Sequence, residues 1–238
     1  MIRLYVSNDL SLNTSFLLNE NQHHYVKNVM RMSVGEELLV FNGKDGEWSA
    51  HIENITKKET SITCTEQTRL QTEENLSDIW LCFAPIKKTE FIIQKATELS
   101  IQTLVPVITD RTVVHTPNME KIKAQAIEAS EQSERLSIPE IKEPIRLDAL
   151  IETAPSERSF FFLNERGYGN TLDTSLSKIA FMIGPEGGFT EKEIQKMTTA
   201  KWTSLHLGRL ILRAETAALA VLAYTQIDRT LKKGCKNL

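Results

Sequence analysis

Strands and helices alternate in the pattern of this chain from residue 79 onward. Short apolar runs of strand length are followed by longer stretches in which apolar residues recur at helical spacing, as in 87–99. Alternation of this kind predicts an α/β fold with a parallel sheet that is covered on both faces. The predicted strands are 79–84, 103–108, 160–163, 179–183 and 204–207, and the predicted helices are 87–99, 119–134, one that begins after Thr190 and one that ends near Leu231.

The first 70 or so residues follow a different pattern, in which short strands are separated by turns. Asn42-Gly43 and Asp45-Gly46 are typical hairpin turn signals, so this part of the chain favours a hairpin-rich barrel. A polar, acidic stretch at 71–75 predicts a domain boundary, with residues 1–72 in one domain and 73–238 in the other. The predicted elements of the first domain are strands 2–6, 38–41, 48–55 and 61–68 and a helix at 21–29.

Composition excludes several classes of protein. A net charge of -3 and a pI near 6.0 argue against wholesale non-specific binding of nucleic acid, although they allow a local basic patch. Cys64, Cys82 and Cys235 are far apart in the chain and indicate neither a disulfide framework nor a zinc site. The adjacent His23 and His24 have no third ligand nearby, so we expect no metal. With no signal peptide and no apolar run of membrane-spanning length, the expected location is cytoplasmic.

Two of the predicted strands end in loops that contain glycine. Gly184, Gly187 and Gly188 follow one strand, and Gly208 follows another. Glycine permits left-handed backbone and close approach of another atom, which suits a pocket built from main-chain donors and acceptors. Glycines after strands are also ordinary turns, so they do not define a site by themselves.

Charged residues next to these glycines favour a site over plain turns. Glu186 lies between the glycines of the first loop, and Arg213 and Glu215 follow the second. Thr190 and Glu193 have the spacing of a capping box, so a helix begins directly after the first loop.

Three strand ends are expected to line one pocket. In open parallel sheets, ligands bind beyond the carboxyl ends of the strands, and 163–165, 184–188 and 207–208 all occupy such ends. The chain has no GxGxxG after its strands and no GxxxxGK[ST], which argues against a dinucleotide site and the common phosphate loop.

Two stretches resemble the signature motifs of a known family. Residues 183–189 (IGPEGGF) and 207–217 (LGRLILRAETA) are similar to those of the RsmE family, the 16S ribosomal RNA uracil-N3 methyltransferases of the SPOUT or trefoil-knot superfamily. Further similarity covers nearly the whole chain. This chain departs from the family pattern at Ser100, where the family usually has Gly, and at Leu210, where it often has Arg. The similar segments upstream are Gln94 to Leu99, Glu128-Ala129, Glu131-Gln132, Arg135, and Val29 to Arg31 with Gly35.

The resemblance implies a knotted, parallel-sheet SPOUT methyltransferase domain at the C-terminus and a PUA-like β-barrel domain at the N-terminus. It also implies S-adenosylmethionine as cofactor, a homodimer, and 16S rRNA or the small ribosomal subunit as partner, with no membrane and no metal. The residues expected to bind the cofactor are Leu163, Asn164, Gly184, Pro185, Glu186, Gly187, Gly188, Leu207, Gly208, Leu212, Ala214, Thr216 and Ala217.

The implied chemistry assigns roles to two charged residues. A sulfonium methyl is already electrophilic, so the protein must chiefly align the uracil nitrogen and remove or stabilise its proton. Loss of that proton places negative charge on the flanking carbonyl oxygens, which Arg213 is suited to stabilise. Arg213 and Glu215 are therefore the predicted catalytic residues. Glu186 or Glu215 is suited either to assist the proton or to balance the cationic cofactor, and the general base stays open.

Basic residues in both predicted domains are candidates for phosphate contacts. A solvated helix face is the alternative interpretation of the same charges. The predicted RNA-binding residues are Arg3, Lys27, Arg31, Lys87, Lys88 and Arg135.

Two other functions stay open at this point. A SPOUT RNA methyltransferase with another target, such as a ribose 2'-OH or another base, would share the cofactor loops. A non-catalytic ribosome-assembly protein that binds RNA would carry a degenerate pocket, against which the intact glycines and Arg213 argue.

Overall fold

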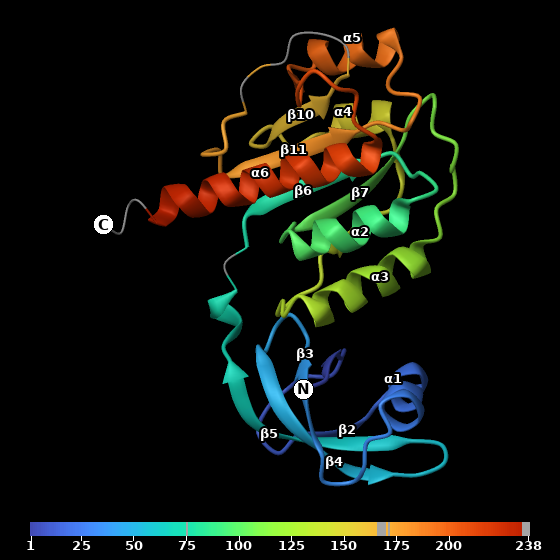
Figure 1. The fold of residues 1–238 in the computed structure, drawn as a ribbon, viewed down its shortest axis with the longest axis vertical. Helices are drawn as coiled ribbons and strands as arrows, with labels where there is room; N and C mark the ends of the chain where they lie inside the picture. Colours follow the sequence, from blue (N-terminus) through green and yellow to red (C-terminus); the bar gives the residue numbers. More distant parts are fainter. Residues whose placement is uncertain (75, 166–169, 171, 235–238) are drawn as a thin grey trace. The chain divides into compact units, whose positions relative to one another are not determined.

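The computed structural model describes residues 1–74, 76–165, 170 and 172–234, and the chain divides into two compact units (Figure 1). The first unit contains Met1–Asn75 and Ser130–Ile138, and the second contains Leu76–Ala129 and Pro139–Leu238. The segment Ser130–Ile138 therefore groups with the N-terminal residues although it follows them in sequence by more than fifty positions. The predicted domain limits at 72 and 73 stay a prediction.

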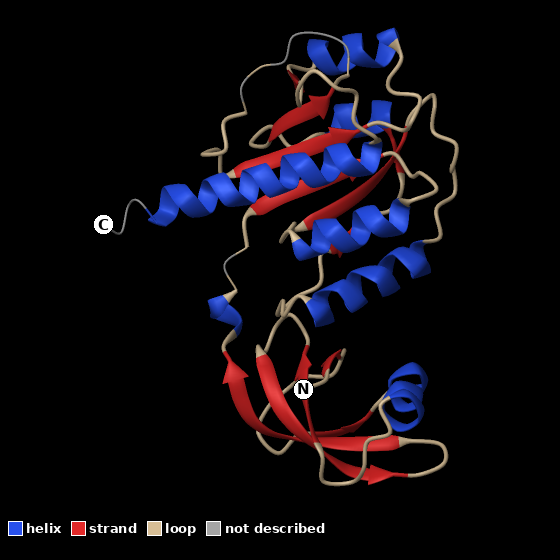
Figure 2. Cartoon of the chain, in the orientation of Figure 1, coloured by secondary structure: helices blue, strands red, loops and turns tan. Residues whose placement is uncertain are grey.

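The first unit is a curled five-stranded sheet (Figure 2). The strand order is β1-β3-β4-β5-β2, in which β1 and β3 are parallel and the other pairs are antiparallel. Buried residues alternate with less buried ones in parts of β3, β4 and β5, which builds a core from Leu38, Val40, Ile52 and Ile62. The strands are β1 (Arg3–Tyr5), β2 (Ser15–Leu17), β3 (Glu37–Phe41), β4 (Glu47–Ile55) and β5 (Thr60–Arg69).

Turn chemistry sets the hairpin between β3 and β4. Gly43 and Gly46 have φ values of +81° and +77°, in the left-handed region that favours glycine. A Cβ at Gly46 would lie 2.2 Å from Arg69 O, so no other residue fits this position. The predicted hairpin turns are confirmed.

The predicted helix at 21–29 has an irregular second half. It begins as α1 (Glu20–His24), where the capping box of Asn19 and Gln22 starts the helix, and continues as a π-helical turn, η1 (Tyr25–Val29). Met30 N donates to Tyr25 O (2.9 Å), the five-residue spacing that defines this turn. Arg31 then adopts a φ of +55° and ends the helix.

The second unit is a seven-stranded sheet in which all described pairs are parallel. The strand order is β12-β10-β11-β6-β7-β8, and β9 also pairs with β7. The strands are β6 (Asp78–Phe83), β7 (Thr103–Ile108), β8 (Glu140–Ile141), β9 (Ile145–Arg146), β10 (Ser159–Leu163), β11 (Lys178–Ile183) and β12 (Thr203–Leu205). The helices are α2 (Thr89–Glu98), α3 (Met119–Gln132), α4 (Leu147–Thr153), α5 (Glu191–Thr199) and α6 (Ala214–Gly234). The last residues of α3, from Ser130, group with the first unit, as does a short 3-10 turn, η2 (Gln71–Glu73), that precedes β6.

Helices cover both faces of this sheet, as predicted. Phe181 and its alternate neighbours in β11 pack with α2, α3 and α6, and Figure 1 shows α6 lying along the sheet next to α2. Met182 faces the other way and packs with α4 and α5. Because consecutive residues of β11 are buried on opposite faces, the strand reads as one continuous apolar run.

Most predicted elements of the second unit are present, with two kinds of difference. The strand predicted at 204–207 ends at Leu205, so His206 and Leu207 already belong to the following loop. The short elements β8, β9 and α4 were not predicted, and neither was β2 of the first unit, because two to seven residues do not establish a period.

Other expectations concern cysteines, metal and membrane. Cys64 and Cys82 are buried free thiols, and Cys235 lies outside the described residues. His23 Nδ1 lies 2.8 Å from Thr60 Oγ1, and the described residues contain no group of three potential metal ligands. Within the described ranges, none of the helices has the length and apolarity to cross a bilayer.

Candidate functional site

A cavity of about 430 Å³ lies where β10, β11 and β12 end. The three strands are adjacent and parallel, with Leu163 opposite Leu205 and Phe162 opposite Met182, so their carboxyl ends meet at one edge of the sheet. The predicted site residues that line this cavity are Leu163, Asn164, Gly184, Pro185, Glu186, Gly188, Leu207, Leu212, Arg213, Ala214 and Ala217. The sequence-based expectation that these three strand ends form one pocket is confirmed.

The loop after β11 is a tight turn that excludes larger residues. Gly188 N donates to Pro185 O (2.9 Å), and Gly188 has a φ of +66°. A Cβ at Gly184 would lie 3.1 Å from the ring of Phe189, and one at Gly188 would lie 3.4 Å from Glu165 Oε1. Both glycines therefore bring backbone close to side chains that line the cavity.

The helix that follows this loop begins at the predicted cap. Thr190 Oγ1 accepts from Glu193 N (3.3 Å), and Thr190 N donates to Glu193 Oε2 (2.8 Å). These reciprocal bonds form the predicted capping box and set the start of α5. The loop is thereby held at its C-terminal end.

The loop after β12 leaves apolar side chains in solvent. Gly208 has a φ of +122°, and Leu210 and Ile211 are 81% and 71% exposed. Ala217 N donates to Arg213 O (2.8 Å), which starts α6 directly after the loop. This second loop is an open, partly apolar wall of the cavity.

Glu215 lies beside the cavity, in the first turn of α6, and its side chain is largely buried. Its carboxylate accepts a hydrogen bond from Lys88 Nζ (2.9 Å). This bond from Lys88 lowers the pKa of Glu215, and the positive charges of Lys88 and Arg213 act in the same direction. Glu215 is therefore an ionised carboxylate at neutral pH.

The cavity lining omits four of the predicted site residues. Gly187, Gly208, Glu215 and Thr216 belong to the same loops and helix start but do not line it. Glu165, at the predicted strand end 163–165, also lines the cavity. Residues that line the cavity and were not predicted include Arg111, Phe189, Glu191 and His206. Three of these adjoin the predicted motifs and could have been found by extending them. Arg111 is more than fifty residues from the nearest motif position of the site, and no local pattern indicates it.

Two predicted RNA-binding arginines are buried and bind protein groups instead. Arg3 Nε lies 2.5 Å from Glu47 Oε2, and the same guanidinium donates to the backbone oxygens of Ser130 (3.1 Å) and Arg135 (2.8 Å). Arg135 is itself 5% exposed, and burial lowers its pKa to about 10. We correct the prediction for both residues, because their guanidiniums are enclosed and have structural partners.

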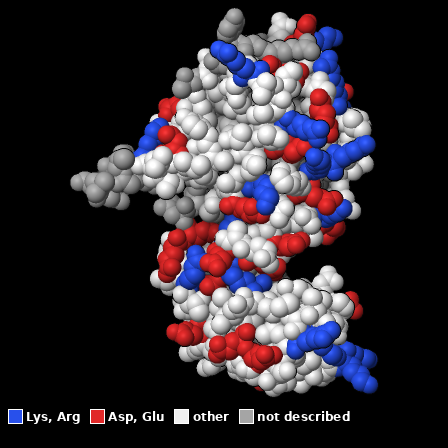
Figure 3. Space-filling view, in the orientation of Figure 1, with Lys and Arg blue, Asp and Glu red and all other residues white. Residues whose placement is uncertain are grey.

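The remaining predicted RNA-binding residues are accessible to different degrees. Arg31, Lys87 and Lys88 are exposed, whereas Lys27 is half-buried and donates to Thr56 O (2.6 Å). This contact brings Lys27 to the turn that carries the exposed Lys57 and Lys58. Figure 3 shows Lys and Arg side chains gathered on one side of the first unit, at the lower right of the view.

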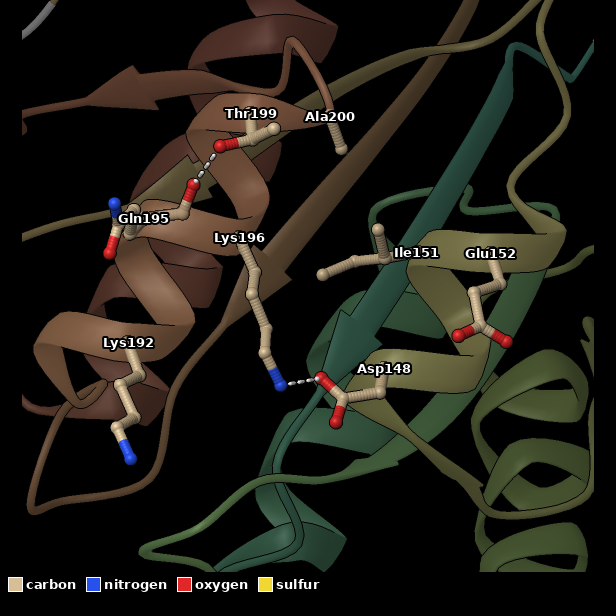
Figure 4. A pocket seen from close by; sticks show the side chains of 8 residues that line it. All are labelled: Asp148, Ile151, Glu152, Lys192, Gln195, Lys196, Thr199 and Ala200. Carbon is tan, nitrogen blue, oxygen red and sulfur yellow. Dashed lines mark hydrogen bonds and ion pairs between the residues drawn. The ribbon is translucent and has the colours of Figure 1, made fainter.

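A larger cavity of about 570 Å³ lies between α4 and α5 (Figure 4). It is crossed by the ion pair of Lys196 Nζ and Asp148 Oδ1 (2.6 Å), and Ile151 and Ala200 are among its lining residues. None of the predicted site residues lines it. We assign the functional site to the smaller cavity, because that one combines strand ends, glycine loops and charged groups.

Fold and site together define a class of protein. Comparison with protein families matches residues 72–226 to an RNA methyltransferase domain and residues 18–63 to an RNA methyltransferase PUA domain. The chain is thus an RNA methyltransferase of the SPOUT fold, with a PUA-like N-terminal domain.

The relatives define the family more narrowly. The chain is 35% identical to ribosomal RNA small subunit methyltransferase E of Rickettsia conorii, over 94% of this chain and 95% of that protein. It is 26% identical to the protein of that name from Bacillus subtilis, over 92% and 93% of the two chains. The chain belongs to the ribosomal RNA small subunit methyltransferase E family.

Two solved structures share the fold and hold a cofactor. The methyltransferase E of Neisseria gonorrhoeae, crystallised with S-adenosyl methionine, has a TM-score of 0.85 and 29% identity, and the match covers 95% of this chain and 97% of that one. A putative methyltransferase from Legionella pneumophila, in complex with the same cofactor, has a TM-score of 0.86 and 29% identity at the same coverage. The predicted family and fold class are confirmed.

Proposed function

We propose that this protein transfers the methyl group of S-adenosylmethionine to N3 of a uridine in 16S rRNA of the small ribosomal subunit. The observation that carries the proposal is the cavity at the ends of β10, β11 and β12, where Arg213 and two glycine loops meet. Family membership supports methyl transfer to small subunit ribosomal RNA, because the relatives are named as small subunit ribosomal RNA methyltransferases.

The cavity fits the proposed cofactor in its chemistry. Gly184 and Gly188 line the cavity and are partly exposed, and Leu207, Leu212 and Ala217 supply apolar wall. Main-chain amides and apolar surface suit an adenine ring, and Glu186 suits the positive charge of a sulfonium. When bound, the cofactor supplies an activated methyl group. The residues that would hold it are those of the three loops around the cavity.

Arg213 is the group best suited to stabilise the reacting base. Arg213 lines the cavity, and its positive charge contributes to the lowered pKa of Glu215. A uracil that loses its N3 proton carries negative charge on its two carbonyl oxygens, and the positive charge of the exposed Arg213 side chain is suited to stabilise it. We therefore propose that Arg213 stabilises the deprotonated base.

Glu215 is poorly suited to accept the N3 proton. The hydrogen bond from Lys88 lowers the pKa of its carboxyl, and a lower pKa makes a weaker base. We propose instead that Glu215 holds the start of α6 in place and balances the charge of Arg213. Its catalytic contribution would then be indirect, through the neighbouring arginine.

RNA contacts are proposed for exposed cations in the first unit. Arg31 lies at the end of η1, and Lys27 contacts the turn that carries Lys57 and Lys58. Lys and Arg side chains neutralise phosphates without reading sequence. In the second unit, Lys87 is the remaining candidate from the sequence, whereas Lys88 is engaged by Glu215.

A homodimer is proposed from the exposed face of α6. Tyr224, Ile227 and Leu231 recur at helical spacing and are 55%, 61% and 64% exposed. A contiguous apolar helix face of this kind is typical of a protein interface, and a second copy is its expected partner. Because the substrate is ribosomal RNA, the expected location is the cytoplasm.

The test is incubation with labelled S-adenosylmethionine and small ribosomal subunits that lack their native uracil methylation, followed by mass spectrometry of the nucleosides. We expect 3-methyluridine at a single position. Label on a ribose or on another base would overturn the target and leave the methyltransferase assignment intact. Cofactor binding without transfer to subunits or to naked rRNA would overturn the proposed reaction.

A further inference from the structure

The loop after β7 is a rigid turn that presents Arg111 to the cavity. Thr109 N donates to Thr112 Oγ1 (2.9 Å), and Thr112 N donates to Thr109 O (3.2 Å). Both threonines are buried, whereas Arg111 between them is exposed and lines the cavity. The backbone on either side of Arg111 is therefore held firmly.

Arg111 reaches the glycine loop that follows β11. Its Nη1 donates to Gly187 O (2.7 Å) and, more weakly, to Phe189 O (3.4 Å). The aliphatic part of the Arg111 side chain also packs on Gly187, since a Cβ at Gly187 would lie 3.4 Å from Arg111 Cδ. Hydrogen bonds from a charged donor are stronger than those between neutral groups.

The residue before Arg111 holds the far end of the same loop. Asp110 N donates to Glu193 Oε1 (2.9 Å), and Thr190 Oγ1 donates to Asp110 Oδ2 (3.3 Å). Glu193 is 4% exposed, and its other oxygen completes the cap of α5. Asp110 and Arg111 thus fasten both the middle and the end of the glycine loop.

Sheet pairing does not hold these two loops together. The strand β6 lies between β7 and β11, so no backbone ladder joins the segments that follow them. The contacts of Asp110 and Arg111 bridge this gap with side-chain and backbone groups. A loop whose shape depends on such contacts becomes more mobile when they are removed.

We propose that Arg111 is a positioning residue of the cofactor cavity, which holds loop 184–190 in the shape that receives S-adenosylmethionine. This inference rests on the proposed function. Without Arg111, the loop must be ordered at the moment of binding, and that cost weakens the affinity. We expect about a tenfold rise in the Kd of the cofactor for Arg111→Ala, with a much smaller change in kcat at saturating cofactor.

Two measurements test the proposal. The first is amide hydrogen exchange of 184–190 in the ligand-free protein, where a positioning role predicts faster exchange in Arg111→Ala than in the wild type. A residue that only touches the cofactor would leave this exchange unchanged. The second is calorimetric titration with S-adenosylmethionine. Arg111→Lys keeps the charge and loses the planar fork, so we expect intermediate values in both measurements.

Lys192→Ala is the matched control. Lys192 is an exposed cation in the first turn of α5, close in sequence to the same loop and outside the lining of the assigned cavity. We expect wild-type exchange and affinity for this variant. Circular dichroism and the unfolding temperature check that each variant is folded, and Arg111→Lys decides the question if Arg111→Ala does not fold.

The outcomes separate this inference from the proposed function. Unchanged exchange of the loop, or faster exchange with unchanged cofactor affinity, would overturn the role of Arg111. A wild-type protein that does not bind S-adenosylmethionine would overturn the proposed function itself, and the positioning role with it. The proposal is supported only if the Arg111 variants, and not the Lys192 control, show both faster exchange of the loop and weaker cofactor binding.

Discussion

Lys88 Nζ lies 2.9 Å from Glu215 Oε1, and this ion pair joins the start of α2 to the start of α6. The carboxylate is the more enclosed partner, with its side chain 10% exposed against 57% for the lysine. Lys88 therefore acts on the cavity through Glu215, next to Arg213. The sequence did not predict this role, because it shows Lys88 only as part of the basic pair Lys87-Lys88.

The first prediction concerns the pH dependence of stability in Lys88→Met. Loss of the hydrogen bond raises the pKa of Glu215 toward its ordinary value. A carboxyl whose pKa is lowered by folding stabilises the protein above its unfolded pKa, and the effect is lost as pH falls through the folded pKa. The variant should thus have a lower Tm than the wild type at pH 7, and the difference should shrink below about pH 4.

Lys87→Met is the control for that experiment. Lys87 is the exposed neighbour of Lys88 and forms no ion pair among the described residues. Its unfolding temperature should match that of the wild type across the pH range. Equal destabilisation of both variants, or a difference that persists in acid, would refute the assigned effect of the ion pair.

The second prediction concerns catalysis by Arg213. Replacement by Ala removes the guanidinium that lines the cavity, and methyl transfer should fall by about a hundredfold or more, with little change in cofactor affinity. Single-turnover transfer and calorimetric titration measure the two effects separately. Arg209→Ala is the control, since Arg209 is exposed in the same loop and does not line the cavity. Parallel loss of transfer and cofactor binding would contradict stabilisation of the reacting base.

The third prediction concerns RNA binding by Arg31. The exposed side chain follows the π-helical turn η1, and its removal should weaken RNA binding and reduce the salt slope by about one. Binding assays at several salt concentrations measure both quantities. Lys44→Ala is the matched control, because Lys44 is exposed in the same unit and its charge is balanced by Asp9 at 2.8 Å. An unchanged slope for Arg31→Ala would remove this residue from the interface.

The fourth prediction concerns the buried pair of Arg3 and Glu47. Both side chains are 6% exposed, and removal of one partner leaves the other charge enclosed. Arg3→Met should lower the free energy of unfolding by about 3 to 5 kcal/mol, as measured by urea denaturation. Glu47→Gln should have a similar effect, and the double variant should cost less than the sum of the two. If the Arg3→Met variant has wild-type stability but binds RNA more weakly, the original prediction that Arg3 contacts RNA would be restored.

Local patterns determined much of the architecture. The strands and helices of the second unit follow from apolar periodicity, and the start of α5 follows from Thr190 and Glu193. The glycines at the ends of β11 and β12 indicated the cavity, because a strand end, a left-handed turn and a nearby charge are all features of adjacent residues. The family motifs occupy these same segments.

Only the tertiary structure decided which charged side chains are free and which are held. Arg3 and Arg135 were predicted to be surface cations, but both are buried. Arg3 is paired with Glu47, which lies more than forty positions away in the sequence. Lys88 and Glu215 are 127 positions apart, and Arg111 and Gly187 are 76 apart. A sequence determines the period, the turns and the caps, since these depend on neighbouring residues. The environment of a charge depends on which distant segments fold beside it, and local pattern does not contain that information.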